Sequence, residues 1–274
     1  MNDNIETRPL TDAEQRAYAG ITELMEVEQG RFEKNDVESL HAGEYAKFAI
    51  DCLNLSVVKV PESVSLFGAA WTMVRKDAAL ALLSSLRGHR VQGAMMIRHM
   101  LETAVIAYYV LGHPNQYVEI AREEADLLKN QTYRWLAVHF PTTSDDIKEF
   151  KGSINRLDSH SNTDNFTFLE NFYESDQPWS GLFADKLDLD MTMASLLDVA
   201  ASVAMVLNGL MEVSEAFPAL TLHGELETWV AQISDPIDGI RAALVEKSNV
   251  ATRQHFNLPE SHIFPWQRAA VGWE

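Results

Sequence analysis

The chain has 274 residues, 46% of them hydrophobic and 23% charged, a balance typical of a globular protein with a substantial core and unlike that of a disordered chain. Its formal charge of −18 opposes non-specific attraction to nucleic-acid backbones and to anionic membrane surfaces. The single cysteine, Cys52, excludes an intramolecular disulfide framework and fits a reducing compartment. Because residues 1–6 are polar and acidic and lack the pattern of a secretory signal, we expect a cytoplasmic protein that does not associate with membranes.

Two helices are predicted in the N-terminal part of the chain, residues 11–58. Thr11 and Glu14 have the spacing of a capping box, and apolar residues follow at helical spacing as far as Phe32. A second periodic stretch comes next and ends before Pro61, because proline cannot continue a helix. We expect these two helices to form a pair that flanks the main bundle.

The core of the bundle is predicted to span about residues 60–217. In chain order we predict a helix after Ser63, a tight corner at 88–90, helices over about 91–111, 114–139 and 144–160, a long loop at 161–186 with a short strand pair at 166–169, and a helix over 190–217. The last of these helices is apolar enough to raise the question of a membrane span, but polar side chains interrupt it and no basic cluster flanks it. We therefore expect it to be a buried central helix.

Shorter helices on either side of Pro236 and an extended aromatic tail are predicted for residues 219–274. We therefore predict one all-α domain over residues 1–274, a bundle of long antiparallel helices around 90–111 and 190–216 with flanking N- and C-terminal helices. Exposed apolar helix faces or the aromatic tail are expected to make the protein a homodimer.

The first candidate site lies on the helix over 91–111 and carries Arg98, His99 and Glu102. Arg98 and Glu102 are four residues apart and share one helix face among apolar neighbours. Because an unpaired buried charge is strongly unfavourable, we expect the two to be paired. They are either a structural ion pair that fixes the helix register or a polar site that meets another helix or a ligand. His99 and the later His160 are the further members predicted for this polar core.

The second candidate site is Arg156 with His160, near the end of the helix predicted over 144–160. Their four-residue spacing lets both side chains project from one helix face. A guanidinium can hold a phosphate and an imidazole can act as general acid or base, so the pair is competent for RNA cleavage. The alternative is that both cations only complement the negative end of the helix dipole.

Metal and cofactor chemistry find little support in the sequence. His99 and Glu102 form one His-x-x-Glu unit without a second, and the chain has neither a His-Glu-x-x-His motif nor a cysteine cluster. Phosphate-binding loops, dinucleotide fingerprints and a Gly-x-Ser-x-Gly elbow are missing as well. We therefore predict no metal and no cofactor.

Two stretches of the chain together carry a resemblance. The run from Ser63 to Pro114 holds the Arg98-x-x-x-Glu102 helix, and a later polar helix end at 154–162 carries His160. These motifs resemble a bacterial and archaeal all-α family of unknown function, whose members carry an Arg-x-x-x-Glu helix and a later Leu-Ser-x-x-x-His element. The resemblance covers roughly residues 60–215, and in it Arg98 and Glu102 match the helix pair and His160 the later histidine.

Arg156-x-x-x-His160 is also similar to a loose form of the motif of HEPN-type ribonucleases and nucleotide-binding bundles. That motif has an arginine, then a polar residue, and a histidine a few residues later, whereas Leu157 follows the arginine here. The resemblance implies a dimer and a toxin–antitoxin or phage-defence context.

Three functional hypotheses follow, and the sequence leaves open whether the protein is an enzyme. The first is a non-catalytic binding or regulatory bundle, in a stress or phage-defence context, in which Arg98, Glu102 and His160 hold the fold, a small ligand or a protein partner. The second is a HEPN-like, metal-independent ribonuclease with Arg156 and His160 as its catalytic residues, which requires binding to nucleic acid. The third is an acidic inhibitor that mimics nucleic acid.

Overall fold

The computed structural model describes residues 11–116, 120, 122–123, 125–154, 189–237 and 239–242, and these residues are almost entirely helical. The helices are, in chain order, α1 (Asp12–Phe32), α2 (Val37–Leu55), the short 3-10 helix η1 (Glu62–Val64), α3 (Ser65–Leu86), α4 (Arg90–Gly112), α6 (Ala125–His139), α7 (Pro141–Ile154), α9 (Leu189–Ala216) and α10 (Leu226–Ser234). Two short strands, β1 (Val57–Lys59) and β2 (Thr221–Leu222), pair antiparallel. The predicted all-α fold is confirmed.

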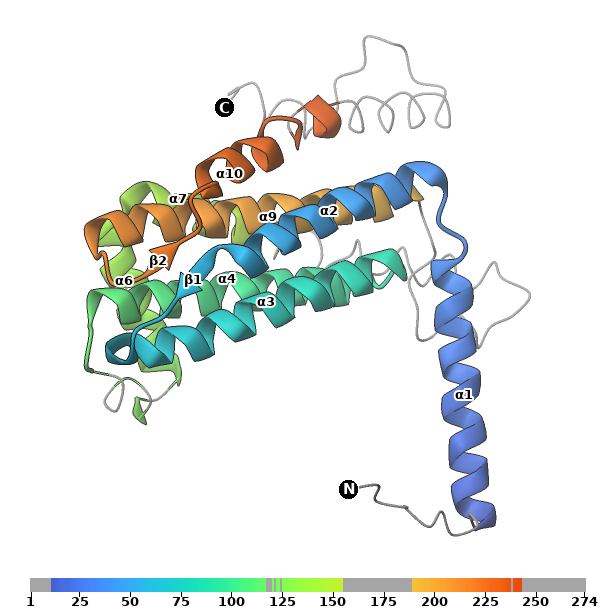
Figure 1. The fold of residues 1–274 in the computed structure, drawn as a ribbon. Coiled ribbons are helices and arrows are strands. Elements are labelled where there is room, and N and C mark those ends of the chain that lie inside the picture. Colours follow the sequence, from blue (N-terminus) through green and yellow to red (C-terminus); the bar gives the residue numbers. More distant parts are fainter. Residues whose placement is uncertain are drawn as a thin grey trace, which may run out of the picture.

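Two layers of long helices form the bundle, as Figure 1 shows. α3 and α4 form one layer as a hairpin, and α2 and α9 lie side by side in the other. α6 and α7 pack against α4 at one end of the bundle, and α7 also contacts α9. α10 lies over α2 and α9 on the side away from α3 and α4.

The helices α4 and α9 run in the same direction. Near the start of both, the Ser195 hydroxyl lies close to Gly93, and further along both, the Tyr108 hydroxyl donates a hydrogen bond to the Val206 carbonyl oxygen at 2.5 Å. Parallel neighbours in a bundle need a crossover connection, and the chain between α4 and α9 supplies it. Antiparallel packing therefore applies to the successive helices α2, α3 and α4, while α9 is parallel to α4.

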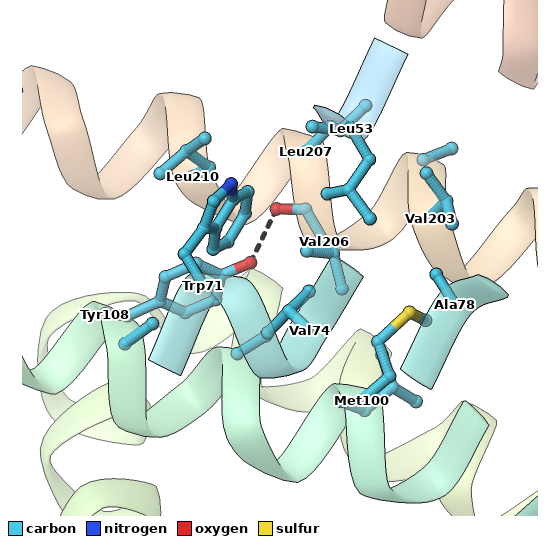
Figure 2. Packing of buried hydrophobic residues seen from close by; sticks show 14 of the residues in the cluster. Leu53, Trp71, Val74, Ala78, Met100, Tyr108, Val203, Val206, Leu207 and Leu210 are labelled. Carbon is cyan, nitrogen blue, oxygen red and sulfur yellow. Dashed lines mark hydrogen bonds between the residues drawn. The ribbon is translucent and has the colours of Figure 1, made fainter. Parts of the chain in front are cut away.

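The core lies where the two layers meet, and large side chains from α3, α4 and α9 interdigitate there (Figure 2). Trp71 and Tyr108 are the largest of the fully buried side chains. A buried hydroxyl is unfavourable unless it is hydrogen-bonded, and the bond from Tyr108 to Val206 satisfies this requirement across the layers. The labelled neighbours in Figure 2 are Leu53, Val74, Ala78, Met100, Val203, Leu207 and Leu210.

Two glycines allow helices to approach closely. A Cβ on Gly93 of α4 would lie 2.9 Å from the Ser85 hydroxyl oxygen of α3, and that hydroxyl is 2.7 Å from the Ser195 hydroxyl of α9. A Cβ on Gly209 of α9 would lie 2.9 Å from the Tyr108 hydroxyl oxygen. Both distances are too short for a carbon, so a larger residue at Gly93 would separate α4 from α3, and one at Gly209 would separate the two layers.

The helix α1 projects from the bundle, and its C-terminal end is attached at the corner between α3 and α4 (Figure 1). Arg31 donates to the Arg87 carbonyl oxygen at 2.6 Å, and Asn35 donates to the Leu86 carbonyl oxygen at 2.6 Å. The corner lies where the sequence predicted it, with Gly88 at a φ of 71°, which glycine adopts without steric cost.

Some boundaries differ from the predicted ones. α6 begins at Ala125 rather than near Pro114. The chain turns after α4, where Asn115 adopts a φ of 69°, and a bend at Glu123 separates the helical residues Ile120 and Arg122 from α6. α7 begins at Pro141 rather than at Ser144, since proline fits the first helical turn, where its missing N–H is not needed. The strands β1 and β2 were not predicted, because each is too short to show alternation. The predicted loop at 161–186, its strand pair at 166–169 and the aromatic tail lie outside the described residues.

Two helices, α4 and α9, are long and apolar enough to cross a membrane by length and composition alone. In both, most of the apolar stretch is buried inside the bundle, which is the behaviour of core helices. Asp198, a polar interruption of α9, pairs with Arg241 at 2.5 Å.

Candidate functional site

The predicted Arg98–Glu102 pair is present on α4. The Arg98 Nε lies 3.3 Å from the Glu102 Oε1, as expected for residues four apart on one helix face. The two side chains keep 33% and 21% of their surface exposed. The pair is therefore at the edge of the bundle core, within reach of solvent, rather than sealed inside it.

Two lysines from other helices reach the same carboxylate oxygen. Lys151 of α7 places its Nζ 2.7 Å from the Glu102 Oε1, and Lys129 of α6 places its Nζ 3.1 Å from it. Lys151 also donates to the Tyr133 hydroxyl oxygen at 2.8 Å. We call Arg98, Glu102, Lys129, Tyr133 and Lys151 the Glu102 cluster.

Local helix geometry explains how the cluster is assembled. α4 contributes two members four residues apart, Arg98 and Glu102, and α6 contributes Lys129 and Tyr133 with the same spacing. α7 follows α6 almost directly and carries Lys151 back toward α4. The cluster thus occupies the junction of three helices at one end of the bundle.

Burial and neighbouring charges shift the pKa values of the cluster. Burial alone raises the pKa of Glu102, but hydrogen bonds and charge from Lys151 and Lys129 outweigh it and lower this pKa to about 2. The pKa of Lys151 is also lowered, because burial of the ammonium and repulsion from Lys129 and Arg98 outweigh the attraction of Glu102. Among the described residues, the single carboxylate of Glu102 thus lies between two lysine ammonium groups.

Tyr133 remains a neutral phenol. Burial and the nearby Glu102 carboxylate both raise its pKa, while Arg98 opposes them only in part. Its oxygen accepts a hydrogen bond from Lys151, so its own O–H remains a donor. The cluster can therefore offer hydrogen-bond donors of two kinds, ammonium and phenol.

His99 does not join the Glu102 cluster, although the sequence placed it in the same polar core. It lies on the side of α4 that faces α3, where its Nδ1 is 2.6 Å from the Asp77 Oδ2. The one-residue step from Arg98 to His99 turns the side chain by about a quarter of a helical turn, which explains the separation. The predicted polar core is thus divided between two sides of α4.

Arg156 and His160 lie outside the described residues, so the predicted ribonuclease pair and the approach of His160 to Arg98 and Glu102 stay predictions. Within the described part of the chain, no group of three or more His, Cys, Asp or Glu side chains is placed to hold a metal ion.

Four residues of these polar sites were missed by sequence reasoning: Asp77, Lys129, Tyr133 and Lys151. The four-residue spacing of Lys129 and Tyr133 was a usable signal, as it was for Arg98 and Glu102. Asp77 lies three residues after Val74 and directly before Ala78, two members of the predicted apolar face of its helix, and this position was the available signal. Lys151 carried no such signal, because its partner depends on how α7 packs.

The chain matches no protein-family model, no curated protein and no solved structure at a significant level. The fold and the site define the protein as an all-α bundle with a polar cluster at a junction of three helices, where two lysines and an arginine meet one glutamate.

Proposed function

We propose that this protein is a non-catalytic binding protein that holds a small oxyanion, such as a phosphate group, at the Glu102 cluster. The observation that carries the proposal is the convergence of Arg98, Lys129 and Lys151 on a single oxygen of Glu102. Among the described residues, two lysines that share one carboxylate are an unusual local feature in a chain with a formal charge of −18.

The charge balance supports an anionic ligand. Among the described residues, the two lysines outnumber the one carboxylate that lies between them. Ions held in a partly dry site interact more strongly than ions in water. An oxyanion bound beside Lys151 would offset the burial and the repulsion that together lower the pKa of this lysine.

The donor geometry supports the same conclusion. An ammonium has three N–H donors, and the described contacts of Lys151 use two of them, to Glu102 and Tyr133. Lys129 keeps 42% of its side-chain surface exposed, whereas Lys151 keeps only 12%. A ligand would thus meet one nearly buried cation, Lys151, and one exposed cation, Lys129.

The role of Glu102 is to hold the cations together in the absence of ligand. Without a carboxylate between them, Lys129 and Lys151 would repel each other and separate. Pre-ordering of binding groups lowers the entropic cost of binding, so Glu102 prepares the site although it shares the sign of the ligand.

The test is the stabilisation of the protein by inorganic phosphate at constant ionic strength, with sodium chloride as the balancing salt. A ligand at ten times its Kd stabilises the folded state by roughly 1.4 kcal/mol, which raises the Tm of a chain of this size by about 3 °C or more. We expect this rise in the wild-type protein and its loss in Lys129→Gln and Lys151→Gln.

Lys148→Gln is the matched control, because Lys148 lies on the same helix as Lys151 and pairs only with the exposed Asp145 among the described residues. It should respond to phosphate as the wild type does. No rise in the wild type, or an equal rise in all four proteins, would contradict the proposal. Because Lys129 is exposed, we expect Lys129→Gln to fold, so this variant still tests the proposal if Lys151→Gln is unstable.

The other sequence-based expectations stay predictions. They are the stress or phage-defence context, the cytoplasmic location, the homodimer, the ribonuclease with Arg156 and His160, and mimicry of nucleic acid. No contact among the described residues favours any of them over the binding function.

A further inference from the structure

A second polar pair lies at the seam between α3 and α4, apart from the Glu102 cluster. Asp77 of α3 is buried, with only 5% of its side chain exposed, and its Oδ2 lies 2.6 Å from the Nδ1 of His99 on α4. Aspartate is almost never fully buried without a partner, because removing its charge from water is costly. The partner here is an imidazole, and 53% of that side chain is exposed.

The contact with Asp77 determines which nitrogen of the His99 ring carries the proton when the ring is neutral. When a carboxylate accepts a hydrogen bond from Nδ1–H, the neutral ring carries its lone pair on Nε2. Asp77 is the one hydrogen-bonding partner of His99 within the described residues, so the Nε2 lone pair is not used there. The buried carboxylate thus holds the half-exposed ring through Nδ1 and leaves the nucleophilic lone pair on Nε2.

The exposed side chains one helical turn from Asp77 and His99 are apolar. Three exposed apolar side chains lie one helical turn from the pair: Met73 and Leu80 on α3, and Met95 on α4. Side chains of this kind do not form hydrogen bonds with Nε2 that would block it.

We propose that His99 is a phosphoryl-accepting histidine and that Asp77 is its positioning residue. The Nε2 lone pair attacks the phosphorus of a phosphoramidate or an acyl phosphate, and an N–P bond forms. The P–N or P–O bond of the donor breaks, and its electron pair leaves with the amine or the carboxylate, which takes up a proton from water as its own basicity requires. No oxidation or reduction takes place.

Asp77 assists this step through the second nitrogen. Attack by Nε2 places positive charge on the ring while Nδ1 keeps its proton. The adjacent carboxylate stabilises that charge, as the aspartate of a catalytic triad stabilises an imidazolium. The site does not require an anion bound at the Glu102 cluster, so it is independent of the proposed function.

The chain contains an internal comparison for this site. His41 on α2 is exposed, but within the described residues it has no carboxylate partner. His89 differs from both, since its own Nε2 is 2.7 Å from Glu28. Among these three, only His99 combines an exposed ring with a carboxylate on Nδ1.

The test is chemical phosphorylation of the whole folded protein with potassium phosphoramidate at neutral pH. Peptide mass spectrometry under conditions that preserve phosphohistidine gives the rate at each histidine. We expect His99 to be modified at least about tenfold faster than His41, and ³¹P NMR to report a phosphoryl group on Nε2. A rate at His99 equal to or below that at His41 would overturn the proposal.

The role of Asp77 is tested with Asp77→Asn, compared with Asp51→Asn, which removes an exposed carboxylate of α2 that pairs with Lys47. Asp77→Asn should lower the rate at His99 toward that of His41 and leave His41 unchanged, while Asp51→Asn should leave His99 unchanged. If Asp77→Asn does not fold, ¹⁵N NMR of the wild type decides instead. A neutral His99 ring with its proton on Nδ1 supports positioning by Asp77, and a proton on Nε2 contradicts it.

Discussion

The Lys151 Nζ lies 2.7 Å from the Glu102 Oε1. This contact joins α7 to α4, two helices that are far apart in the sequence. The contact lies at the junction of α4, α6 and α7, beside a second lysine from α6. It therefore links the packing of three helices to the electrostatics of the candidate site. Removing either partner should affect both.

Glu102→Gln is expected to destabilise the protein at neutral pH. Loss of the Glu102 carboxylate leaves the nearly buried Lys151 without its anionic partner and close to a second cation, Lys129. A hydrogen bond between charged groups contributes about 1.5–3 kcal/mol, so we expect a decrease of about 2 kcal/mol in the free energy of unfolding, measured by urea denaturation. Glu149→Gln, an exposed change on α7, is the control and should change stability by less than about 0.5 kcal/mol.

The stability should also fall in acid because of Glu102. Its pKa is depressed from an ordinary 4.5 to about 2 in the folded protein, so its contribution is complete above the unfolded value and is lost as the pH falls toward the folded value. Between pH 5 and pH 3 this amounts to about 1–2 kcal/mol after allowance for solvent screening. Urea denaturation at both pH values should show a steeper loss for the wild type than for Glu102→Gln, and parallel losses would contradict the assignment.

Alanine should have opposite effects at two helical glycines. At Gly209 a Cβ would meet the Tyr108 hydroxyl oxygen at 2.9 Å and the Thr143 Cγ2 at 3.0 Å, so we expect a loss of about 1–3 kcal/mol from overpacking. At Gly30 a Cβ meets nothing within 4 Å, and the better helix propensity of alanine should stabilise α1 by up to about 1 kcal/mol. Thermal unfolding of both variants measures the difference, and a shift of the same sign in both would contradict the described packing.

Tyr108→Phe removes the hydrogen bond that connects the two layers. The hydroxyl is fully buried and its partner is the Val206 carbonyl oxygen, so we expect a loss of about 1 kcal/mol in the free energy of unfolding. The neighbouring Tyr109→Phe is the matched control, since no described hydrogen bond uses the Tyr109 hydroxyl, and it should cost less than half as much. Equal losses for the two variants would show that the bond contributes nothing specific.

Cys52 should be unreactive in the folded protein. Burial, together with the nearby Asp51 carboxylate, raises the pKa of the thiol to about 11, so the reactive thiolate is scarce at neutral pH. We expect slow labelling by a disulfide reagent in native buffer and full labelling in guanidinium chloride. As the single cysteine of the chain, it then also reports unfolding in the experiments above.

Helix periodicity was sufficient to predict the class of fold and most helices. The corner at Gly88 and the Arg98–Glu102 pair were also predictable, because each depends on residues close in sequence. The start of α6 was misplaced, since Pro114 fits the first turn of a helix as well as it fits the turn that is present.

The rest of the site depends on tertiary packing. Lys129 and Lys151 reach Glu102 only because α6 and α7 dock on one side of α4, and Asp77 reaches His99 only because α3 docks on the other. Periodicity shows which face of a helix is buried but does not show which helix covers it. The partner of a polar residue could therefore be predicted from the sequence only where both residues lie on the same helix.

The most direct test of the anion site is ¹H–¹⁵N NMR of the lysine ammonium groups during titration with inorganic phosphate. Lys151 and Lys129 are both within 3.1 Å of the Glu102 Oε1, and we expect both signals to shift with one saturable dependence on phosphate concentration. The signal of Lys148, which faces Asp145, should change only with ionic strength. Shifts of the same size at all three lysines, or none at Lys151, would contradict an oxyanion site at the Glu102 cluster.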